Sequence, residues 1–271
     1  MQYSILMSVY RNDKPEYLDA SIQSMLMQTV LTNDFVIIID GPINKELYDV
    51  IKKYKNTYPA IINIIELEKN MGLGYALMKG VNVCKNELVA RMDADDISYK
   101  NRIKIQLKKM NELKDIDVLG SYVEEFIDNP KDIVSVREVP LIDRDIKSKM
   151  RRGNPLNHSS VVFKKSKVIK AGNYKNIRTN QDIELWNRMK YDNCTFLNIP
   201  RSLVKFRLNN DTIRRRKDIN NNILMVRIWC SFYRKKYCGF VDLLYISVVS
   251  FLNIILPVSI LQILYKISRK R

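Results

Sequence analysis

Histidine and cysteine are scarce in this chain. It has one histidine, His158, and four cysteines that form no C-x-x-C pair. A zinc site and a redox dithiol are therefore not expected, and unpaired cysteines fit a reducing cytosol. The first ten residues also lack the basic segment and long apolar core of a secretory signal, so we expect no export.

Glycine and proline are few as well, with eight of each among 271 residues. No serine-rich or proline-rich tract is present, which leaves little room for a disordered linker. Hydrophobic residues make up 46% of the chain and charged residues 28%. A chain of this length and composition is long enough for one large α/β domain with a modest appendage.

Acidic residues are in the minority. The 46 Lys and Arg outnumber the 29 Asp and Glu, which gives a formal charge of +17. Such an excess favours polyanionic surroundings, whether nucleic acid, anionic lipid headgroups or phosphorylated substrates. Charge alone does not choose among them.

Apolar runs alternate with helical spacing through the first half of the chain. Strands are predicted at residues 4–10, 35–40, 61–67 and 88–92, with helices at 16–28, 45–54 and 73–84 between them. This alternation predicts a doubly wound, mostly parallel sheet with right-handed crossovers. After residue 97 the alternation of strands and helices becomes less regular. This change suggests a nucleotide-binding half at 1–97 and an acceptor-binding half at 98–217 that share one sheet.

Residues 218–271 are predicted to form a helical tail. No charged side chain occurs in 243–265, while 234–236 and 266–271 are basic. A single membrane span would carry one basic cluster across the bilayer, whereas helices in the headgroup plane, broken at Pro257, keep both on the cytoplasmic side. We favour the in-plane anchor at the cytoplasmic face of the cell membrane; a span or hairpin and a buried helix pair stay open.

An acidic junction follows the predicted strand at 88–92. There Asp93, Asp95 and Asp96 come directly after Met92. Open α/β sheets bind ligands at the carboxyl ends of their strands, and carboxylates bind Mg²⁺ or Mn²⁺, which bridge to phosphate oxygens. The junction therefore predicts a metal–diphosphate site, although acidic triplets also cap helices or lie solvated in turns.

Two further aspartates stand at predicted element ends. Asp40 follows the second strand, so we expect it near Asp93 at the same sheet edge, where it suits a base or ribose. It precedes Gly-Pro, so a plain turn residue is the alternative. Asp182 opens a late helix, where the helix dipole alone would favour a carboxylate.

Six motifs together resemble a known family. In chain order they are Ser8-Val-Tyr10, Asp40-Gly-Pro42, Asn70-x-Gly72-Leu-Gly74, Arg91-Met-Asp93-Ala-Asp95-Asp96, Asn157-His-Ser-Ser160 and Gln181-Asp-x-Glu-Leu-Trp186. This order resembles the family 2 glycosyltransferases over about residues 3–217. It is most similar to the bacterial branch that builds exopolysaccharide, capsule or lipopolysaccharide, of the amylovoran-transferase type.

The resemblance implies a GT-A fold over 1–217, a nucleotide-sugar donor, most often of uridine, a divalent Mn²⁺ or Mg²⁺ ion and inversion at the anomeric carbon. The acceptor it implies is a growing, lipid-linked surface polysaccharide. Matched position by position, the residues that would hold the nucleoside are Ser8, Tyr10 and Asp40. The metal and the diphosphate would be held by Asp93, Ala94 and Asp95. Asp182 would be the catalytic base. A metal would neutralise the departing diphosphate, and a carboxylate would deprotonate the acceptor hydroxyl.

Two positions depart from the family pattern. Gln181 replaces the usual Glu before Asp182, and residues 76–80 lack the usual arginine, for which Lys69 or Arg91 is the expected substitute. Lys69, Asn70 and Arg91 are therefore expected to contact the nucleotide sugar. His158 is either a structural hydrogen-bonding residue or a further metal ligand.

Residues 214–217 form a basic run, and there Arg214 and Arg215 either lie on a solvated face or close over the diphosphate. A noncatalytic basic protein that binds membrane or nucleic acid is the alternative function. For the enzyme no nucleic-acid partner is expected.

Overall fold

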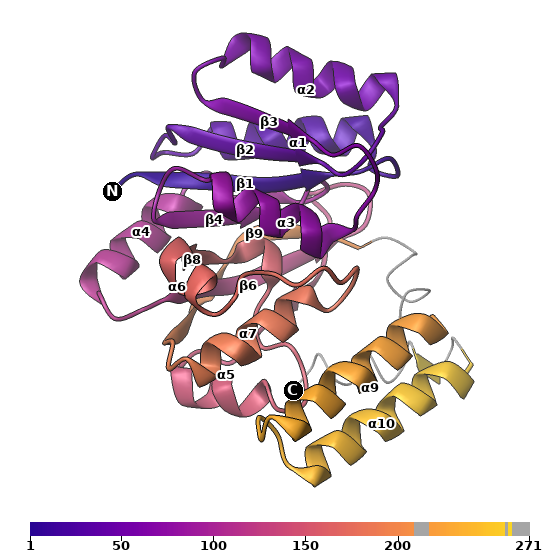
Figure 1. Cartoon of the computed structure of the whole chain (residues 1–271). Coiled ribbons are helices and arrows are strands. Elements are labelled where there is room, and N and C mark those ends of the chain that lie inside the picture. Colours follow the sequence, from indigo (N-terminus) through magenta and orange to yellow (C-terminus); the bar gives the residue numbers. More distant parts are fainter. Residues whose placement is uncertain (209–216, 258–259, 262–271) are drawn as a thin grey trace.

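The computed structural model describes residues 1–208, 217–257 and 260–261. Within them a nine-stranded sheet carries helices on both faces (Figure 1). The strands are β1 (Tyr3–Val9), β2 (Asp34–Ile39), β3 (Ile62–Glu66), β4 (Leu88–Met92), β5 (Ile97–Ser98), β6 (Val118–Phe126), β7 (Ile133–Arg137), β8 (Val162–Lys164) and β9 (Phe196–Arg207). The helices are α1 (Pro15–Leu26), α2 (Lys45–Thr57), α3 (Leu73–Val83), α4 (Arg102–Glu112), α5 (Asp143–Lys149), α6 (Lys165–Lys170), α7 (Gln181–Tyr191), α9 (Ile219–Arg234) and α10 (Phe240–Ile255), with a short 3₁₀ turn η1 (His158–Ser160).

The first half of the sheet is parallel, as predicted. Its strands lie in the order β3-β2-β1-β4, and each neighbouring pair is parallel. Every residue of β2 is buried, which explains its continuous apolar run, since a strand covered on both faces needs no polar side. The carboxyl ends of these strands share one edge, so Asp40 and Asp93 follow strands that flank β1 on either side.

The second half of the sheet is mixed, so the prediction of a mostly parallel sheet is wrong there. β8 lies between β4 and β6 and is antiparallel to both, β7 pairs antiparallel with β6, and β5 pairs antiparallel with β9. Antiparallel neighbours need no helical crossover, which is why the βα alternation fades after β4. The two short strands expected near residues 196 and 204 form the single strand β9, parallel to β6.

Two hydrophobic cores cover the two faces of the sheet. One packs α1, α2 and α4 through residues such as Leu18 and Ile103, and the other packs α3, α6 and α7 through residues such as Leu77 and Trp186. Successive residues of β1 alternate between them, with Ile5 in the first core and Leu6 in the second. This is the alternation that a strand buried on both faces requires.

The tail forms a helical hairpin, α9 and α10, beside α5 and α7 (Figure 1). A third apolar cluster joins Trp229 and Phe232 of α9 to Ile246 of α10 and Ile183 of α7. No helix in the described residues is both long and apolar enough to cross a membrane. The expectation of helices is confirmed for α9 and α10, and α10 ends at Ile255, two residues before Pro257. Residues 258–259 and 262–265 of the predicted apolar stretch lie outside the described residues.

Gly41 allows the loop after β2 to pass close to the loop after β3 at the carboxyl edge of the sheet. Its φ is +83°, and a Cβ at this position would lie 2.3 Å from the backbone nitrogen of Asn70. Only glycine combines that backbone conformation with so close an approach.

We predict that Gly41→Ala lowers the free energy of unfolding by about 1–3 kcal/mol, through backbone strain and displacement of the Asn70 loop. Urea unfolding measures it. Gly153→Ala is the control, since a Cβ there meets nothing within 4 Å. Equal losses in both variants would contradict the prediction.

Candidate active site

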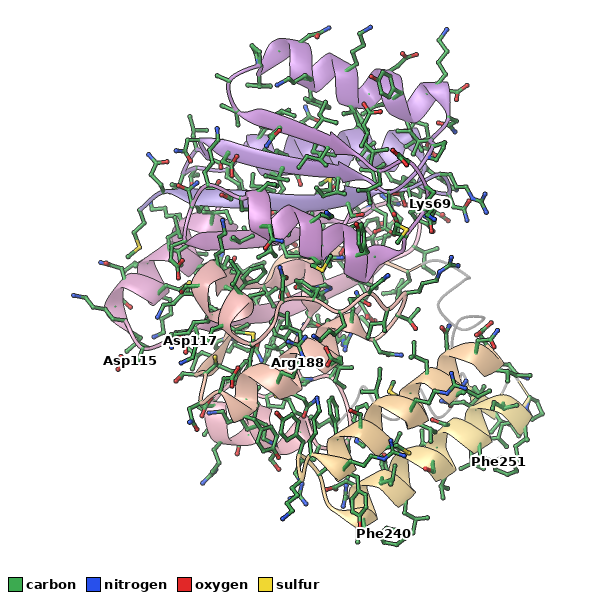
Figure 2. All side chains as sticks on the ribbon, viewed as in Figure 1. Lys69, Asp115, Asp117, Arg188, Phe240 and Phe251 are labelled. Carbon is green, nitrogen blue, oxygen red and sulfur yellow. The ribbon has the colours of Figure 1, made fainter. Side chains whose placement is uncertain are left out.

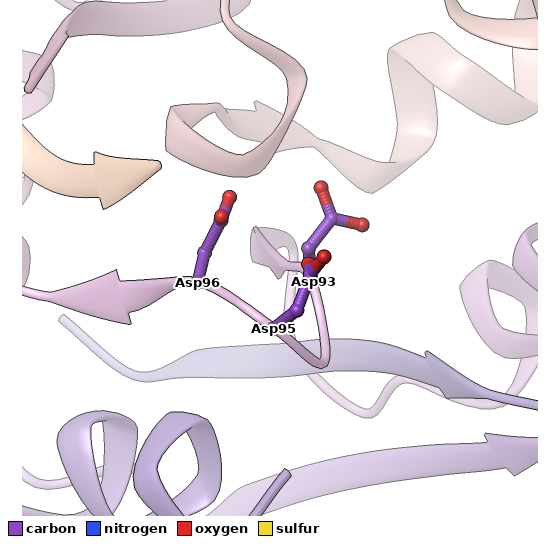
Figure 3. A group of neighbouring side chains, drawn as sticks. All are labelled: Asp93, Asp95 and Asp96. Carbon is purple, nitrogen blue, oxygen red and sulfur yellow. The ribbon is translucent and has the colours of Figure 1, made fainter. Parts of the chain in front are cut away.

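Three carboxylates gather in the turn between β4 and β5. Ligand atoms of Asp93, Asp95 and Asp96 all lie within 4.8 Å of one another. Figure 3 shows the three side chains projecting to the same side of the turn. Clustered hard oxygens suit Mg²⁺ or Mn²⁺, so these residues fit the metal predicted from the sequence. Asp96 joins the group, although of these three aspartates Asp93 and Asp95 alone were expected as ligands.

Two distant elements hold the backbone of this turn. The Ser21 hydroxyl of α1 donates to the Asp93 carbonyl at 2.6 Å, and Arg207 at the end of β9 donates from Nε to the Asp95 carbonyl at 3.1 Å. The Arg207 backbone N–H also donates to the Asp96 carboxylate at 2.9 Å. Its guanidinium stacks on Tyr17, 3.6 Å from the ring centroid. These contacts fix the turn mainly through its main chain.

Arg91 is the cation of the site. Its side chain is 2% exposed and forms an ion pair with Asp93. Burial opposes its charge, but Asp93 more than compensates, so the pKa of Arg91 is raised. Its Nε and Nη1 have no hydrogen-bond partner among the described residues. A buried guanidinium with two unused donors is suited to an anionic ligand.

Asp182 lies at the first turn of α7, within electrostatic reach of the same arginine. Asn154 donates to its Oδ2 at 2.5 Å, and the Ile183 N–H donates to its Oδ1 at 2.9 Å. Burial raises the pKa of Asp182, although these hydrogen bonds and the Arg91 charge oppose the rise. A fixed carboxylate with a raised pKa has the properties of a general base.

Crowding of like charges perturbs the acidic group. Burial, followed by the charges of Asp95 and Asp93, raises the pKa of Asp96 well above its ordinary value. Asp13, just after β1, accepts the Tyr10 N–H at 2.9 Å, and its pKa is raised to about 7, chiefly by burial and then by Asp95 and Asp93. A bound cation would relieve this repulsion.

Asp40 already has backbone partners. Its two carboxylate oxygens accept the N–H groups of Met71 and Gly72 at 2.7 and 2.9 Å, and its carbonyl accepts the Asn70 side chain at 3.1 Å. It therefore holds the loop after β3 against the end of β2. Its contact with a nucleoside stays a prediction.

The other predicted nucleoside residues lie at the same edge. Ser8 is half-buried in β1 and Tyr10 is exposed just after it. Ala94 is buried within the acidic turn. Lys69 is exposed in the loop between β3 and α3 (Figure 2). Arg214 and Arg215 lie outside the described residues.

His158 lies in an aromatic cluster rather than in the acidic group. Its Nε2 lies 2.9 Å from the Tyr174 hydroxyl, and its ring centroid is 6.0 Å from that of Trp186. Burial, and then the Arg91 charge, hold the pKa of His158 well below its ordinary value. The metal-ligand group found in the described residues does not include it. The structure thus supports the structural interpretation of His158, and its metal role stays a prediction.

Sequence reasoning missed Asn154, Tyr174, Arg207 and Asp13. Asn154 and Tyr174 contact predicted site residues from segments that carry no motif, and Arg207 reaches the acidic turn from 112 positions along the chain. Asp13 could have been suspected, because it follows the first strand at the same sheet edge as the other acids.

Comparison with known proteins places this site in a family. The family model described as Glycosyl transferase family 2 matches residues 4–168. The amylovoran biosynthesis glycosyltransferase AmsE of Erwinia amylovora is 33% identical over 268 residues, which cover 99% of each chain. The UDP-Gal:alpha-D-GlcNAc-diphosphoundecaprenol beta-1,3-galactosyltransferase of Escherichia coli is 35% identical over 267 residues, covering 98% of this chain and 95% of that protein.

Solved structures share the fold at low sequence identity. The mannosyltransferase PcManGT from Pyrobaculum calidifontis, in complex with GDP-Man and Mn²⁺, gives a TM-score of 0.67 at 12% identity, over 93% of this chain and 70% of that one. TarS 1-349 of S. aureus in complex with UDP gives 0.60 at 15% identity, over 83% of this chain and 66% of that one. The expected GT-A-like α/β fold is confirmed.

We predict that Mn²⁺ raises the melting temperature more at about pH 8 than at about pH 5.5, because the carboxylates must lose protons to bind it. Without metal, we expect the opposite trend: the melting temperature is lower at about pH 8 than at about pH 5.5. The folded state holds the Asp13 proton more tightly than the unfolded chain, so stability falls as pH rises from its ordinary pKa of 3.8 to about 7.

Thermal unfolding with and without Mn²⁺ checks both trends. Asp95→Asn should remove most of the stabilisation by Mn²⁺, and Asp13→Asn should make the metal-free fall of stability with pH less steep. A Mn²⁺ effect unchanged by Asp95→Asn would place the ion elsewhere.

Proposed function

This chain belongs to glycosyltransferase family 2 and is a glycosyltransferase, and we propose that it moves a sugar from a UDP-sugar to a lipid-linked surface polysaccharide acceptor, with inversion. The observation that carries the proposal is the position of Arg91. It pairs with Asp93 of the acidic group, and its charge also acts on Asp182. One guanidinium thus lies within electrostatic reach of both the metal–diphosphate motif and the proposed base.

Asp182 would take the proton of the acceptor hydroxyl. Single displacement needs the nucleophile and the leaving group on opposite faces of the sugar, and a base beside the nucleophile. Asn154 and the Ile183 N–H orient the carboxylate, and burial makes it more basic than an exposed one. Protonation would stop the reaction, so the rate should fall at low pH.

Asp93 and Asp95, with Asp96 beside them, would hold Mn²⁺ or Mg²⁺, whose charge stabilises the departing diphosphate. Arg91 would bind a diphosphate oxygen through its unused Nε and Nη1. The bound cation would in turn reduce the repulsion among the three carboxylates. Fixed charges at the leaving group lower the barrier because they need no reorganisation during the reaction.

Relatives and structural neighbours suggest the donor and the acceptor. The Escherichia coli relative is named for UDP-Gal and for a GlcNAc joined through diphosphate to undecaprenol. A TarS structure contains UDP. A uridine donor and a polyprenyl-diphosphate-linked acceptor are therefore the substrates we expect here.

The α9–α10 hairpin would hold the enzyme at the inner membrane surface, on the cytoplasmic side. Figure 2 shows Phe240 and Phe251 projecting from α10 away from the sheet, and both are exposed. Lys235 and Lys236 lie in the adjacent turn. Exposed apolar side chains next to lysines suit an interface with anionic lipids. The noncatalytic alternative is set aside because the chain is an enzyme by family.

We predict that Asp182→Asn lowers kcat by about 10²–10⁴-fold with a much smaller change in the donor KM, because it removes the base but keeps the shape. Steady-state kinetics measure it. Asp192→Asn, at the exposed far end of α7, is the matched control and should leave kcat unchanged. A small loss in Asp182→Asn would assign the base to another group.

A donor panel tests the proposed function itself. Purified enzyme with Mn²⁺ and a lipid-linked acceptor should transfer one sugar from a UDP-sugar, as read by mass spectrometry of the product. Asp95→Ala should abolish transfer while adhesion to anionic vesicles persists. No release of nucleoside diphosphate from any donor, and no donor-induced thermal shift, would reject the proposal.

A further inference from the structure

A basic cavity lies between α5 and α10. Its volume is about 580 Å³, and its lining includes Lys149, Arg151, Arg152 and Tyr245. Asp145 also lines it and pairs with Arg144, at 3.1 Å. None of the cationic side chains in this lining belongs to the glycosyl-transfer machinery described above, so their role is open.

The two arginines share a single buried carboxylate. Arg151 Nη2 lies 2.8 Å from Asp242 Oδ2, and Arg152 Nε lies 2.7 Å from Asp242 Oδ1. Asp242 is 1% exposed, whereas the arginines are 52% and 47% exposed. One carboxylate cannot neutralise two guanidinium groups, so the pair carries excess positive charge and has N–H donors to spare on the cavity wall.

An apolar stripe begins at the same cavity. Tyr245 belongs both to the cavity lining and to a row of exposed side chains along α10. The row consists of Phe240, Val241, Leu244, Tyr245, Val248, Phe251, Leu252 and Ile255. Their spacing puts them on one helix face, opposite the buried Asp242, Ile246 and Ser250. A continuous exposed apolar face of this kind marks an interaction surface.

The arginines are also close to the proposed base. Arg152 lies two residues before Asn154, which limits the separation of their Cα atoms to about 7 Å. Asn154 in turn donates to Asp182 at 2.5 Å. The Trp229 indole of α9 donates to the Arg151 carbonyl at 2.8 Å and fixes this loop. The arginine pair therefore belongs to the same loop as Asn154, the residue that holds the proposed base.

We infer that the cavity binds the diphosphate of the lipid-linked acceptor and that the stripe on α10 carries its hydrocarbon chain. The inference rests on the proposed function and specifies its acceptor subsite. Guanidinium groups pair with phosphate oxygens in bidentate fashion, and the isoprenoid chain lies along the exposed row where that row meets the membrane surface. The sugar attached to this diphosphate then extends toward Asp182, where its hydroxyl is deprotonated.

Direct binding tests the subsite without catalysis. The probe is geranyl diphosphate in EDTA, which weakens metal-dependent binding at the donor site, measured by titration calorimetry against geraniol and inorganic diphosphate. The wild-type protein should bind geranyl diphosphate more tightly than it binds geraniol or inorganic diphosphate. Arg152→Gln should weaken it by about tenfold or more, the loss expected for a charge-assisted hydrogen bond. Arg151 continues to pair with Asp242 in this variant, which protects the fold.

Two further variants sharpen the test. Lys170→Gln removes one exposed positive charge from α6, outside the cavity lining, and should leave binding unchanged. Phe251→Ser, on the exposed stripe, should weaken geranyl diphosphate but not inorganic diphosphate. Equal losses of binding in Lys170→Gln and Arg152→Gln would mean that the probe responds only to the overall charge of the protein. Loss of binding in Asp95→Asn, with binding kept in Arg152→Gln, would place the probe in the donor site. Either result overturns the inference.

Kinetics separates this inference from the proposed function. With a short-chain lipid diphosphate sugar as acceptor, Arg152→Gln should raise the acceptor KM about tenfold while the donor KM stays constant. An alkyl glycoside without diphosphate should show no such difference. Absence of transfer in wild type would reject the proposed function alone, whereas unchanged probe binding and an unchanged acceptor KM in Arg152→Gln would reject the acceptor subsite.

Discussion

The rest of the site depends on the buried guanidinium of Arg91. Carboxylates repel one another when they crowd together, and burial together with the charges of Asp95 and Asp93 raises the pKa of Asp96. Arg91 offsets part of that repulsion through its ion pair with Asp93. Burying an arginine is itself costly, and it is tolerated where the charge is paired. The ion pair therefore adds to the contacts of Ser21 and Arg207 that hold the main chain of the acidic turn at the sheet edge.

A second buried arginine supports the first. Arg102 on α4 donates from Nη2 to the Arg91 carbonyl at 2.8 Å and from Nε to Gln106 at 3.0 Å. Burial lowers the pKa of Arg102 to about 9. It has no carboxylate partner among the described residues, so its hydrogen bonds to neutral groups hold it. Arg102 thus fixes the backbone from which Arg91 projects.

The carboxyl-terminal hairpin is packed against this site rather than attached loosely. Ile183, next to the proposed base, belongs to the same apolar cluster as Trp229 and Ile246. A change in the way the hairpin packs would therefore displace α7 and Asp182. The α9–α10 hairpin and the helix that carries Asp182 therefore form one packed unit.

Much of the first half was predictable because its information is local. Apolar runs and helical spacing set β1 to β4, and parallel strands bring Asp40 and Asp93 to one edge without knowledge of the side-chain contacts. The motif order also indicated the family. The spacing of apolar residues was less informative after β4. There β8 lies between β4 and β6, which both precede it in the chain.

The missed contacts are long-range. Arg207 meets the acidic turn from the end of β9, and Asn154 reaches Asp182 from a loop without a motif. No periodicity reports such pairs. The role of Asp40 was also only partly foreseen, because its carboxylate holds Met71 and Gly72. The aromatic surroundings of His158 fit its structural interpretation, and its role as a metal ligand stays a prediction.

Anomalous diffraction from crystals grown with Mn²⁺ and a UDP-sugar tests the central claim most directly. We expect one manganese peak within bonding distance of Asp93 or Asp95, with the diphosphate bridging it and Arg91 and the sugar facing Asp182. A manganese ion bound away from the acidic turn, or a sugar whose reactive carbon faces away from Asp182, would contradict it.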